Sequence, residues 1–425
     1  MAEAFIVAAV RTAGGKRAGR LMRNKRRAAP SVSPPPRGGG RRMAAALGAL
    51  SGWHPADLAA SVLDELMART GCDPALVEDV IMGCVGQAGE QAVNIARNAV
   101  LGSKLPESVP ATSVDRQCGS SQQALHFAAQ AVMAGSMDVV IAAGVESMSR
   151  VPMGLPSTLA AKAGMGYYVS PNMARRYPGV QFSQFIGAEM VARKYGLTRE
   201  QVDAFALQSH QRAIAATRSG AFAAEILPLA VRMNDGTPDG QMRGELHAVD
   251  EGIRFDASLA SIAGVKLLQE GGVCTAANAS QICDGAAGLL VVNERGLKAL
   301  GVKPLARVHH MTVIGGDPVI MLEAPIPATQ RALQKAGMRI DDIDLFEVNE
   351  AFASVPVAWL QATGADPAKL NVNGGAIALG HPLGGSGAKL MTTLLHGLMA
   401  RGGRYGLQTM CEGGGLANVT IIERL

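Results

Sequence analysis

The sequence is poor in aromatic residues and has no closely paired cysteines, and both features narrow the class of protein. Aromatic residues make up 4% of the chain, whereas 48% is hydrophobic and 51 of the 425 residues are glycine. This composition favours an α/β protein with close packing of helices on a sheet over an all-β protein. The six cysteines form no Cys-x-x-Cys pair and show no regular spacing, which argues against a disulfide framework or a structural zinc site. We therefore expect a protein of the reducing cytoplasm.

Long apolar runs and targeting signals are also missing. No apolar run reaches the ~18 residues that a membrane-spanning helix requires. The first residues do not form a charged-then-apolar signal sequence, and the final Ile-Ile-Glu-Arg-Leu is not a peroxisomal address. The sequence thus predicts no membrane span and a cytoplasmic location.

Acidic residues are absent from one strongly basic segment. Residues 16–42 hold ten Lys and Arg and no Asp or Glu, so the formal net charge of +5 leaves −5 on the rest of the chain. Tracts of proline, glycine and arginine cannot form a packed core. We expect a disordered insert over about 16–45 that is solvated and binds no nucleic acid. The alternative is that this segment contacts nucleic acid or an acidic partner.

Strand-like and helix-like segments alternate on both sides of a region rich in Met, Pro and Gly. This succession is typical of a doubly wound α/β protein. We predict a first half over 1–293, which includes a loop subdomain at about 150–264, and a second half over 294–425. Strands are predicted near 3–10, 77–83, 139–144, 305–315, 343–348, 405–410 and 418–423, and helices near 55–70, 94–101, 124–135, 185–195, 199–218, 327–335 and 388–401.

A cysteine stands at the start of the most apolar predicted helix. The stretch 115–123, Asp-Arg-Gln-Cys-Gly-Ser-Ser-Gln-Gln, is a turn that delivers Cys118 to the first turn of this helix. The positive end of a helix dipole stabilises a thiolate, which makes Cys118 a candidate nucleophile. The alternative is a cysteine that merely fills a small buried gap.

Three later turns carry further reactive groups. His381 lies in Gly-His-Pro-Leu-Gly-Gly-Ser-Gly-Ala, which lacks the spacing of a dinucleotide fingerprint and the ending of a P-loop. Cys411 precedes Glu-Gly-Gly-Gly, whose backbone N–H groups can point at an oxyanion. Asn349 and Glu350 follow a predicted strand, and we expect Glu350 to be a hydrogen-bonded orienting group rather than a base.

These motifs, in this order, resemble those of the thiolases, the acyl-CoA:acetyl-CoA C-acyltransferases. The resemblance rests on Cys-Gly-Ser-Ser, Gly-Val-Glu-Ser-Met-Ser, Asn-Glu-Ala-Phe-Ala, Asn-Val-Asn-Gly-Gly-Ala-Ile-Ala, the His381 turn and the Cys411 turn. It covers nearly the whole chain apart from the basic insert and is closest to the actinobacterial type that degrades fatty acids or steroids. It implies the thiolase fold: two pseudo-twofold-related βαβαβαββ halves in a layered α-β-α-β-α core, with the loop subdomain taken up by coenzyme A.

The resemblance also implies a role for each candidate residue. Cys118 would take the acyl group while His381 accepts its proton, and Cys411 would be the second acid/base. His381 and a water held by Asn349 would stabilise the enolate oxygen. The backbone N–H groups of Cys118 and Gly413 would stabilise the tetrahedral intermediate.

For coenzyme A, the family pattern maps onto three further residues. Arg254 would lie near the nucleotide phosphates, and the hydroxyls of Ser261 and Ser280 along the pantetheine arm. An exposed arginine and two helix-cap serines are the structural alternatives. Coenzyme A would be a co-substrate, so no cofactor and no metal are expected, and relatives suggest a homodimer or homotetramer.

The sequence departs from the family pattern at two places, the basic insert and Glu412. Glu412 adds a charge beside Cys411 where small or apolar residues are common in related chains.

Two other activities remain as alternatives. A decarboxylating ketosynthase of related fold would need no second catalytic cysteine, so Cys411 argues against it. A lipid- or CoA-binding scaffold without catalysis would not need all four reactive positions, which are Cys118, Asn349, His381 and Cys411.

Overall fold

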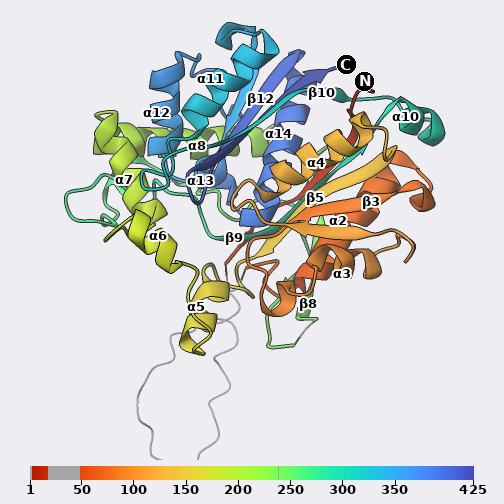
Figure 1. The fold of residues 1–425 in the computed structure, drawn as a ribbon, viewed down its shortest axis with the longest axis horizontal. Coiled ribbons are helices and arrows are strands. Elements are labelled where there is room, and N and C mark those ends of the chain that lie inside the picture. Colours follow the sequence, from red (N-terminus) through yellow and green to blue (C-terminus); the bar gives the residue numbers. More distant parts are fainter. Residues whose placement is uncertain (1, 18–47, 238) are drawn as a thin grey trace, which may run out of the picture.

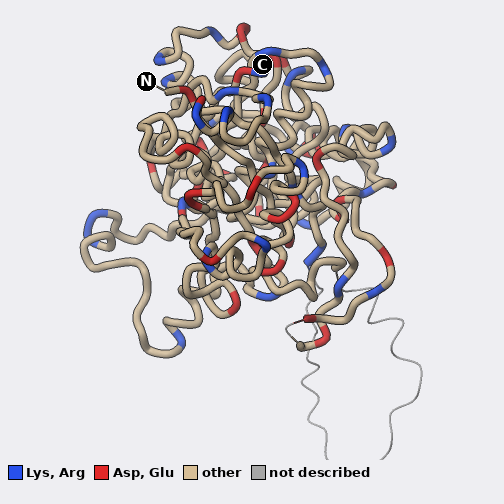
Figure 2. Tube along the Cα trace, turned by 90° about the vertical axis from the view of Figure 1, so that its right-hand side faces the viewer, with Lys and Arg blue, Asp and Glu red and all other residues tan. Residues whose placement is uncertain are grey.

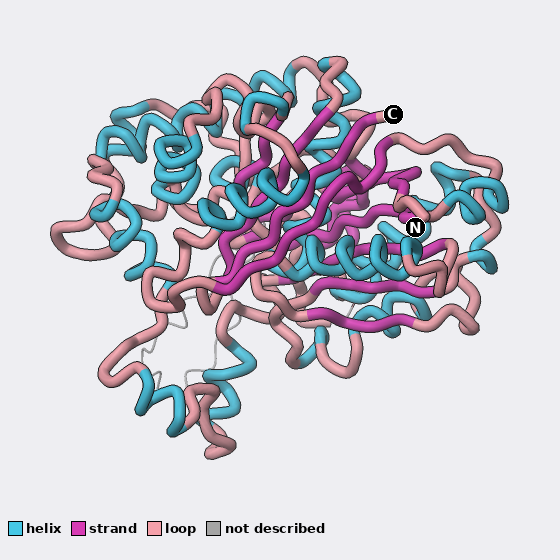
Figure 3. Tube along the Cα trace, turned by 45° about the horizontal axis from the view of Figure 1, so that its top comes forward, coloured by secondary structure: helices cyan, strands magenta, loops and turns pink. Residues whose placement is uncertain are grey.

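The computed structural model describes residues 2–17, 48–237 and 239–425 of the chain. Its centre is a mixed sheet with the strand order β11-β12-β13-β10-β1-β9-β5-β3-β4, to which β2 and β6 add short pairings. Helices flank the strands on both faces of this sheet (Figures 1 and 3). Among the described residues, no helix is both long and apolar enough to cross a membrane.

Five strands from the first half of the chain form one side of the sheet. Strand β3 pairs in parallel with β4 and β5, whereas β9 pairs antiparallel with both β5 and β1. Every residue of β5 and β9 is buried, as expected for central strands covered on both faces. The strands are β1 (Phe5–Thr12), β3 (Asp79–Gly83), β4 (Ala111–Val114), β5 (Val139–Ser147) and β9 (Cys283–Val292).

The second half of the chain repeats this arrangement. Strand β11 pairs in parallel with β12, and β13 pairs antiparallel with β12 and β10. A single bridge between Phe346 and Leu370 marks the position of the fifth strand. In chain order, both halves then read 3-2-4-5-1 across the sheet, which confirms the predicted pseudo-twofold fold. The strands are β10 (Ala306–Gly315), β11 (Leu345–Val348), β12 (Tyr405–Glu412) and β13 (Leu416–Arg424).

The two halves meet at their first strands. Strands β1 and β10 pair antiparallel through Phe5 with Arg307 and Ile6 with Ala306. One continuous sheet therefore runs through both halves, although most of its hydrogen bonds lie within each half.

Two buried helices, α4 (Ser120–Met133) and α14 (Ser386–Arg401), form the layer that both halves share. Their side chains pack with strand residues of both halves in one hydrophobic cluster. Helices α2 (Pro55–Thr70) and α3 (Ile95–Leu101) cover the other face of the first half. The helices α11 (Pro325–Ala336) and α12 (Ser354–Thr363) do the same for the second half. These layers are the α-β-α-β-α order that was predicted.

The middle of the chain forms helices of 5 to 20 residues, a hairpin of β7 and β8, and the short strand β6, which pairs with β1. Figure 1 shows α5 projecting below the body of the molecule. The boundaries predicted for this subdomain and for the two halves stay predictions. The elements are α5 (Leu155–Lys162), α6 (Pro171–Arg176), α7 (Gln184–Lys194), α8 (Arg199–Arg218), β6 (Ile226–Leu227), β7 (Leu229–Met233), β8 (Gln241–His247) and α9 (Leu259–Ala263).

The predicted basic insert lies almost wholly outside the described residues. Lys16, its first residue, still pairs with Cys283 in β2 (Gly15–Lys16), and residues 18–47 are not described. Over the described chain, acidic and basic residues are interspersed (Figure 2). Two short helices, α10 (Glu294–Leu300) and α13 (Ala376–Leu379), complete the fold.

Candidate functional site

Cys118 lies in a tight turn between β4 and α4. The carboxylate of Asp115 accepts the N–H of Gln117 at 2.8 Å. The hydroxyl of Ser120 accepts the N–H of Arg116 at 2.9 Å and donates to the carbonyl oxygen of Gln117 at 2.6 Å. Gln117 has φ +49°, a left-handed conformation that is uncommon for residues other than glycine and often marks functional sites. Hydrogen bonds from both ends of the turn thus fix the backbone that carries Cys118.

The structure corrects the prediction that the start of the helix activates Cys118. Helix α4 begins at Ser120 with Gly119 as its N-cap, so Cys118 precedes the first helical turn. Burial, followed by the nearby charge of Glu412, raises the pKa of the Cys118 thiol to about 12. A helix dipole contributes only about 0.3–1 kcal/mol and does not offset this. Cys118 is therefore a thiol at rest and needs a base.

His381 is the candidate base predicted in the second half. The Nδ1 atom of its buried ring lies 2.5 Å from the hydroxyl oxygen of Ser386. That hydroxyl donates its own hydrogen to the carbonyl oxygen of Pro382, at 2.8 Å, so the ring proton must sit on Nδ1. Burial, with the charge of Lys389, lowers the pKa of His381 to about 4. The ring is neutral, and Nε2 is its acceptor nitrogen.

The glycine-rich turn after His381 packs directly against the start of α4. A Cβ atom on Gly144 would come within 2.3 Å of the carbonyl oxygen of Gly384. One on Gly387 would come within 2.2 Å of a backbone nitrogen in the first turn of α4. Only residues without side chains allow backbones to approach so closely. Leu383 accordingly packs against the small cluster formed by Cys118, Leu390 and Met410, so the two turns lie close together.

A buried carboxylate of β5 anchors the same turn. Glu146 accepts the N–H groups of Val85, Gly86 and Gly384, each at 2.9 Å, and the side-chain amide of Gln91 at 2.7 Å. Burial raises the pKa of Glu146, and these four donors counteract that effect. Glu146 therefore fixes the His381 turn to the strand ends of the first half.

A buried ionic cluster lies behind His381. Lys389 in α14 lies 3.1 Å from a carboxylate oxygen of Asp250, and Arg11 bridges Asp250 and Glu225 at 3.0 and 2.5 Å. Burial alone would raise the pKa of Asp250, but Arg11 and Lys389 hold it at about 2. The cluster ties α14 to β1 and keeps a positive charge close to His381, which favours the neutral ring.

Asn349 and Glu350 follow β11 at the same end of the sheet. The side-chain nitrogen of Asn349 lies 3.4 Å from Nε2 of His381, while its buried Oδ1 has no hydrogen-bond partner among the described residues. Glu350 accepts hydrogen bonds from Ser209 at 2.7 Å, from Asn371 at 2.9 Å and from a backbone N–H of α13 at 3.0 Å. Glu350 is thus the orienting group that was predicted, and the free oxygen of Asn349 can hold a water.

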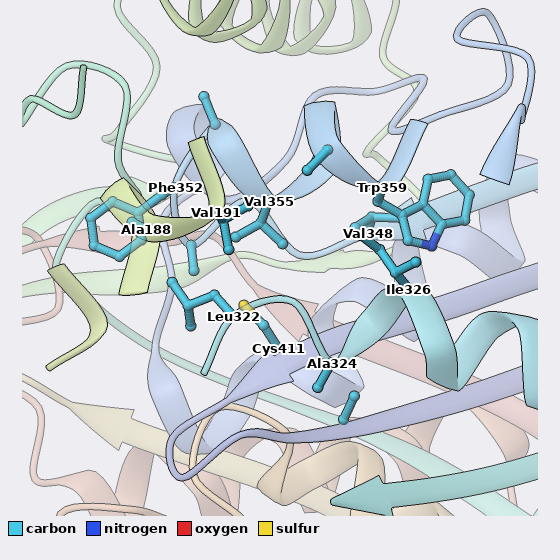
Figure 4. Packing of buried hydrophobic residues seen from close by; sticks show 14 of the residues in the cluster. Ala188, Val191, Leu322, Ala324, Ile326, Val348, Phe352, Val355, Trp359 and Cys411 are labelled. Atoms are coloured by element: carbon cyan, nitrogen blue, oxygen red, sulfur yellow. The ribbon is translucent and has the colours of Figure 1, made fainter. Parts of the chain in front are cut away.

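Cys411 is the penultimate residue of β12. The sequence predicts a turn at this position. Strand β13 pairs with β12 up to Glu412, which extends the strand by two residues. Figure 4 shows Cys411 beside Leu322 and Ala324 in the hydrophobic cluster of the second half. Burial, then Cys118 and Glu412, raise its thiol pKa well above the ordinary value. Cys411 therefore holds a proton that it can donate.

Gly413 brings the second turn into contact with the first. A Cβ atom on Gly413 would lie 2.8 Å from Oε1 of Gln117. Gly414 and Gly415 have φ +82° and +78°, which other residues rarely adopt. The turn at 413–415 therefore lies against the Cys118 turn.

The residues predicted to bind coenzyme A lie between Cys118 and His381 in the sequence and are more exposed than either. Arg254 is exposed, and its N–H donates to the ring of His210 at 3.3 Å. Ser261 closes a capping box with Ser258 at the start of α9, the structural alternative that was considered. Ser280 caps no helix, and its N–H donates to Ala351 at 2.9 Å, next to the Asn349 segment. Their roles toward coenzyme A stay predictions.

Sequence reasoning missed several residues that hold this site. Ser386, Glu146 and Lys389 position His381, but only the folded chain shows which hydroxyl or charge faces it. The sole signal in the sequence was that Ser386 and Glu146 lie inside the motifs. All six cysteines are free and buried. Within the described part of the chain, no group of His, Cys, Asp and Glu is arranged to hold a metal ion.

Comparisons with known proteins give matches over most of the chain. The family model described as "Thiolase, N-terminal domain" matches residues 40–295, and "Thiolase, C-terminal domain" matches residues 302–424. The chain is 49% identical to "Steroid 3-ketoacyl-CoA thiolase FadA6" of Mycobacterium tuberculosis, over 100% of this chain and 95% of that protein. It is 42% identical to a "3-ketoacyl-CoA thiolase" of Yersinia enterocolitica, over 89% and 95% of the two chains.

A solved structure is similar over the same extent. The crystal structure of the Bacillus anthracis acetyl-CoA acetyltransferase superposes with a TM-score of 0.84 at 33% sequence identity. The match covers 100% of this chain and 99% of that one. The insert does not prevent an end-to-end match.

Proposed function

The chain belongs to the thiolase family, and on this premise we propose that it cleaves 3-ketoacyl-CoA with coenzyme A through an acyl-Cys118 intermediate. The products are acetyl-CoA and an acyl-CoA shortened by two carbons. The reverse reaction condenses acetyl-CoA with an acyl-CoA, or two acetyl-CoA to acetoacetyl-CoA. The observation that carries the proposal is the meeting of the Cys118 turn, the neutral imidazole of His381 and the Cys411 turn at one end of the sheet.

The acylation step uses Cys118 and His381. Nε2 of His381 takes the proton of the Cys118 thiol, and the sulfur attacks the 3-keto carbon of the substrate. The bond between the second and third carbons breaks, so the acyl group stays on Cys118 and acetyl-CoA departs as its enolate. Because burial raises the pKa of Cys118 to about 12, a thiolate forms only as it attacks.

The departing enolate needs a proton, and Cys411 is placed to supply it. Its pKa is held above the ordinary thiol value, so it carries a proton at neutral pH. Coenzyme A then gives its thiol proton to the Cys411 thiolate and attacks acyl-Cys118. The shortened acyl-CoA leaves, and Cys118 recovers its proton from His381, so protons balance over the cycle.

Two sets of donors stabilise the oxyanions. The enolate oxygen would meet His381, protonated on Nε2 after the first step, and a water on Asn349, whose Oδ1 is free. The tetrahedral oxyanion would meet the backbone N–H groups of Cys118 and Gly413. One such donor is worth about 3–4 kcal/mol in the barrier.

The substrate class is proposed from the relatives. Since relatives at 49% and 42% identity are named steroid 3-ketoacyl-CoA thiolase and 3-ketoacyl-CoA thiolase, we propose a degradative role on fatty-acyl or steroid side-chain thioesters. Coenzyme A would act as a co-substrate along Arg254, Ser261 and Ser280.

The six reduced cysteines support a cytoplasmic enzyme. The exposed apolar side chains around α5 support a homodimer or homotetramer, which light scattering would test.

The activity is tested with purified enzyme, acetoacetyl-CoA and coenzyme A. We expect the absorbance of the 3-ketoacyl group to fall, and Cys118→Ala to abolish this. Cys72→Ala, which removes a buried thiol under α2, is the matched control and should retain activity. Full activity in Cys118→Ala, or none in the native enzyme, would refute the proposal. Rates with longer and steroid-derived 3-ketoacyl-CoAs then define the substrate.

A further inference from the structure

Glu412 is a buried carboxyl group that the mechanism above does not use. It ends β12 directly after Cys411, and its relative exposure is 0%. Neither carboxyl oxygen accepts a hydrogen bond of ordinary geometry from the described residues. A carboxylate that is buried without donors costs several kcal/mol, so a chain keeps one only where surrounding structure or function requires it.

The carboxyl group lies against the turn of the nucleophile. A Cβ atom on Gly119 would come within 1.9 Å of Oε1 of Glu412. Gly119 has φ −88°, which any residue adopts, so glycine is needed here for space rather than for backbone conformation. Met410, two residues earlier on the same face of β12, packs against Cys118. Glu412 therefore lies on the side of β12 that faces the Cys118 turn.

The charged and titratable groups around Glu412 come from three elements. Arg116 and Cys118 face it from the turn before α4, and Cys411 faces it from its own strand. From β13, the N–H of Asn418 is the nearby backbone donor. Burial raises the pKa of Glu412 to about 8, although Arg116 opposes this. Arg116 makes no hydrogen bond to Glu412, because neither carboxyl oxygen of Glu412 has a partner among the described residues.

We propose that Glu412 is a positioning residue that acts on Cys118 through its charge. In the neutral form it fills the space over Gly119 and leaves the Cys118 thiol free to give its proton to His381. In the ionised form its negative charge opposes the thiolate and slows attack by Cys118. This inference rests on the proposed function, since it assigns Glu412 a part in acylation.

The expected size of the effect of Glu412 on the Cys118 pKa follows from the electrostatics of buried sites. A like charge at close range in such a site shifts a neighbouring pKa by at least about one unit, which is a tenfold change in the thiolate fraction. The coupling is reciprocal, so a thiolate at Cys118 also disfavours ionisation of Glu412. Glu412→Gln removes the charge and keeps the shape of the side chain. It should therefore speed the reaction of Cys118 at high pH and have little effect at low pH.

The test is the rate at which iodoacetamide, a neutral reagent, alkylates Cys118 in the full-length protein between pH 6 and 9.5. Peptide mass spectrometry assigns the label to Cys118. We expect Glu412→Gln to react like the native protein, within about twofold, at pH 6, and about tenfold faster at pH 9. Glu347→Gln is the matched control, because Glu347 is also buried with an unpartnered oxygen but its charge acts on Glu350 and Glu225. It should leave the profile unchanged.

A ratio of variant to native rate that stays constant with pH would overturn the proposal, because a purely structural effect changes both rates alike. Failure of Cys118 to react at any pH would count equally against it, since the proposal requires a thiolate. The infrared band of a protonated carboxyl group, lost in Glu412→Gln, gives a second reading of the neutral form. Alkylation needs no substrate turnover, so this outcome is separate from the acetoacetyl-CoA assay that tests the proposed function.

Discussion

The hydroxyl group of Ser386 holds the imidazole of His381 on the side opposite Asn349. Ser386 accepts from Nδ1 at 2.5 Å, and the amide of Asn349 lies 3.4 Å from Nε2. The nitrogen that can accept a proton therefore lies on the Asn349 side of the ring. The predictions below follow from this and related contacts.

Replacing Ser386 by alanine removes the group that fixes the ring proton on Nδ1. We expect kcat to fall by about 10–100-fold, since part of the contribution of a general base is lost when its tautomer is not held. Ser121→Ala is the control: it removes a buried hydroxyl that accepts the N–H of Ala388 in the same helix but does not touch His381. Steady-state rates with acetoacetyl-CoA measure both variants, and equal losses in the two would contradict the tautomer argument.

Cys411→Ala should separate proton transfer from acyl transfer. Without its thiol, exchange of deuterium from solvent into the methyl group of acetyl-CoA should fall by at least about 10²-fold. Alkylation of Cys118 should continue at a rate of the same order. Mass spectrometry follows both reactions. Undiminished deuterium exchange would show that another group handles the α-proton.

Glu146→Gln should loosen the turn that carries His381. The amide replaces one acceptor oxygen by an NH₂ group that faces N–H donors, and we expect a loss of about 2–4 kcal/mol in the free energy of unfolding. Because one of the donors is Gly384, kcat should fall as well. Urea unfolding and steady-state kinetics are the measurements. A stable variant with native kcat would show that the turn holds without Glu146.

Gly119→Ala tests the position of Glu412 directly. The new methyl group would overlap Oε1 of Glu412, and overpacking of this kind costs about 1–3 kcal/mol. Adding Glu412→Ala should restore part of this stability, so the two changes should be non-additive. Thermal or urea unfolding of the single and double variants measures the coupling. Additive losses would place the carboxyl group elsewhere.

The buried imidazole of His126 should make stability depend on pH. Burial lowers its pKa to about 3, below the unfolded value near 6.5. Between these values the unfolded chain binds the extra proton, so this histidine makes stability fall as pH decreases from about 6.5 to about 3. His126→Gln should lose less stability than the native protein between pH 7 and 5. Parallel slopes in urea unfolding would contradict this.

The positions of most strands and helices were predictable from the sequence. The ends of the strands and helices that carry site residues were harder to predict. The period of apolar residues predicts α8 at its observed bounds and α2 almost to the residue, because amphipathic helices carry their signal locally. Cys411 and Glu412 were expected in a turn because three glycines follow. The pairing with β13 that keeps them in the strand is a tertiary contact that the local sequence does not reveal.

The motifs of the candidate site were predictable from the sequence, but the protonation states of its residues were not. Cys118, His381 and Cys411 stand out because each lies in or directly before a run of small residues. Their protonation depends on burial and on Glu412, Ser386 and Lys389, which lie close only after folding. The helix dipole suggested an activated Cys118, and desolvation outweighs it.

The position of β13 has a consequence for synthesis of the protein on the ribosome. Strand β13 lies between β12 and β10 and completes the sheet of the second half, and β10 in turn pairs with β1 of the first half. A growing chain emerges with its N-terminal part first and can fold that part early. It would then carry Cys118 without Asn349, His381 or Gly413 in place until those residues have been made. Nascent chains that stop before β13 should therefore be unable to consume acyl-CoA.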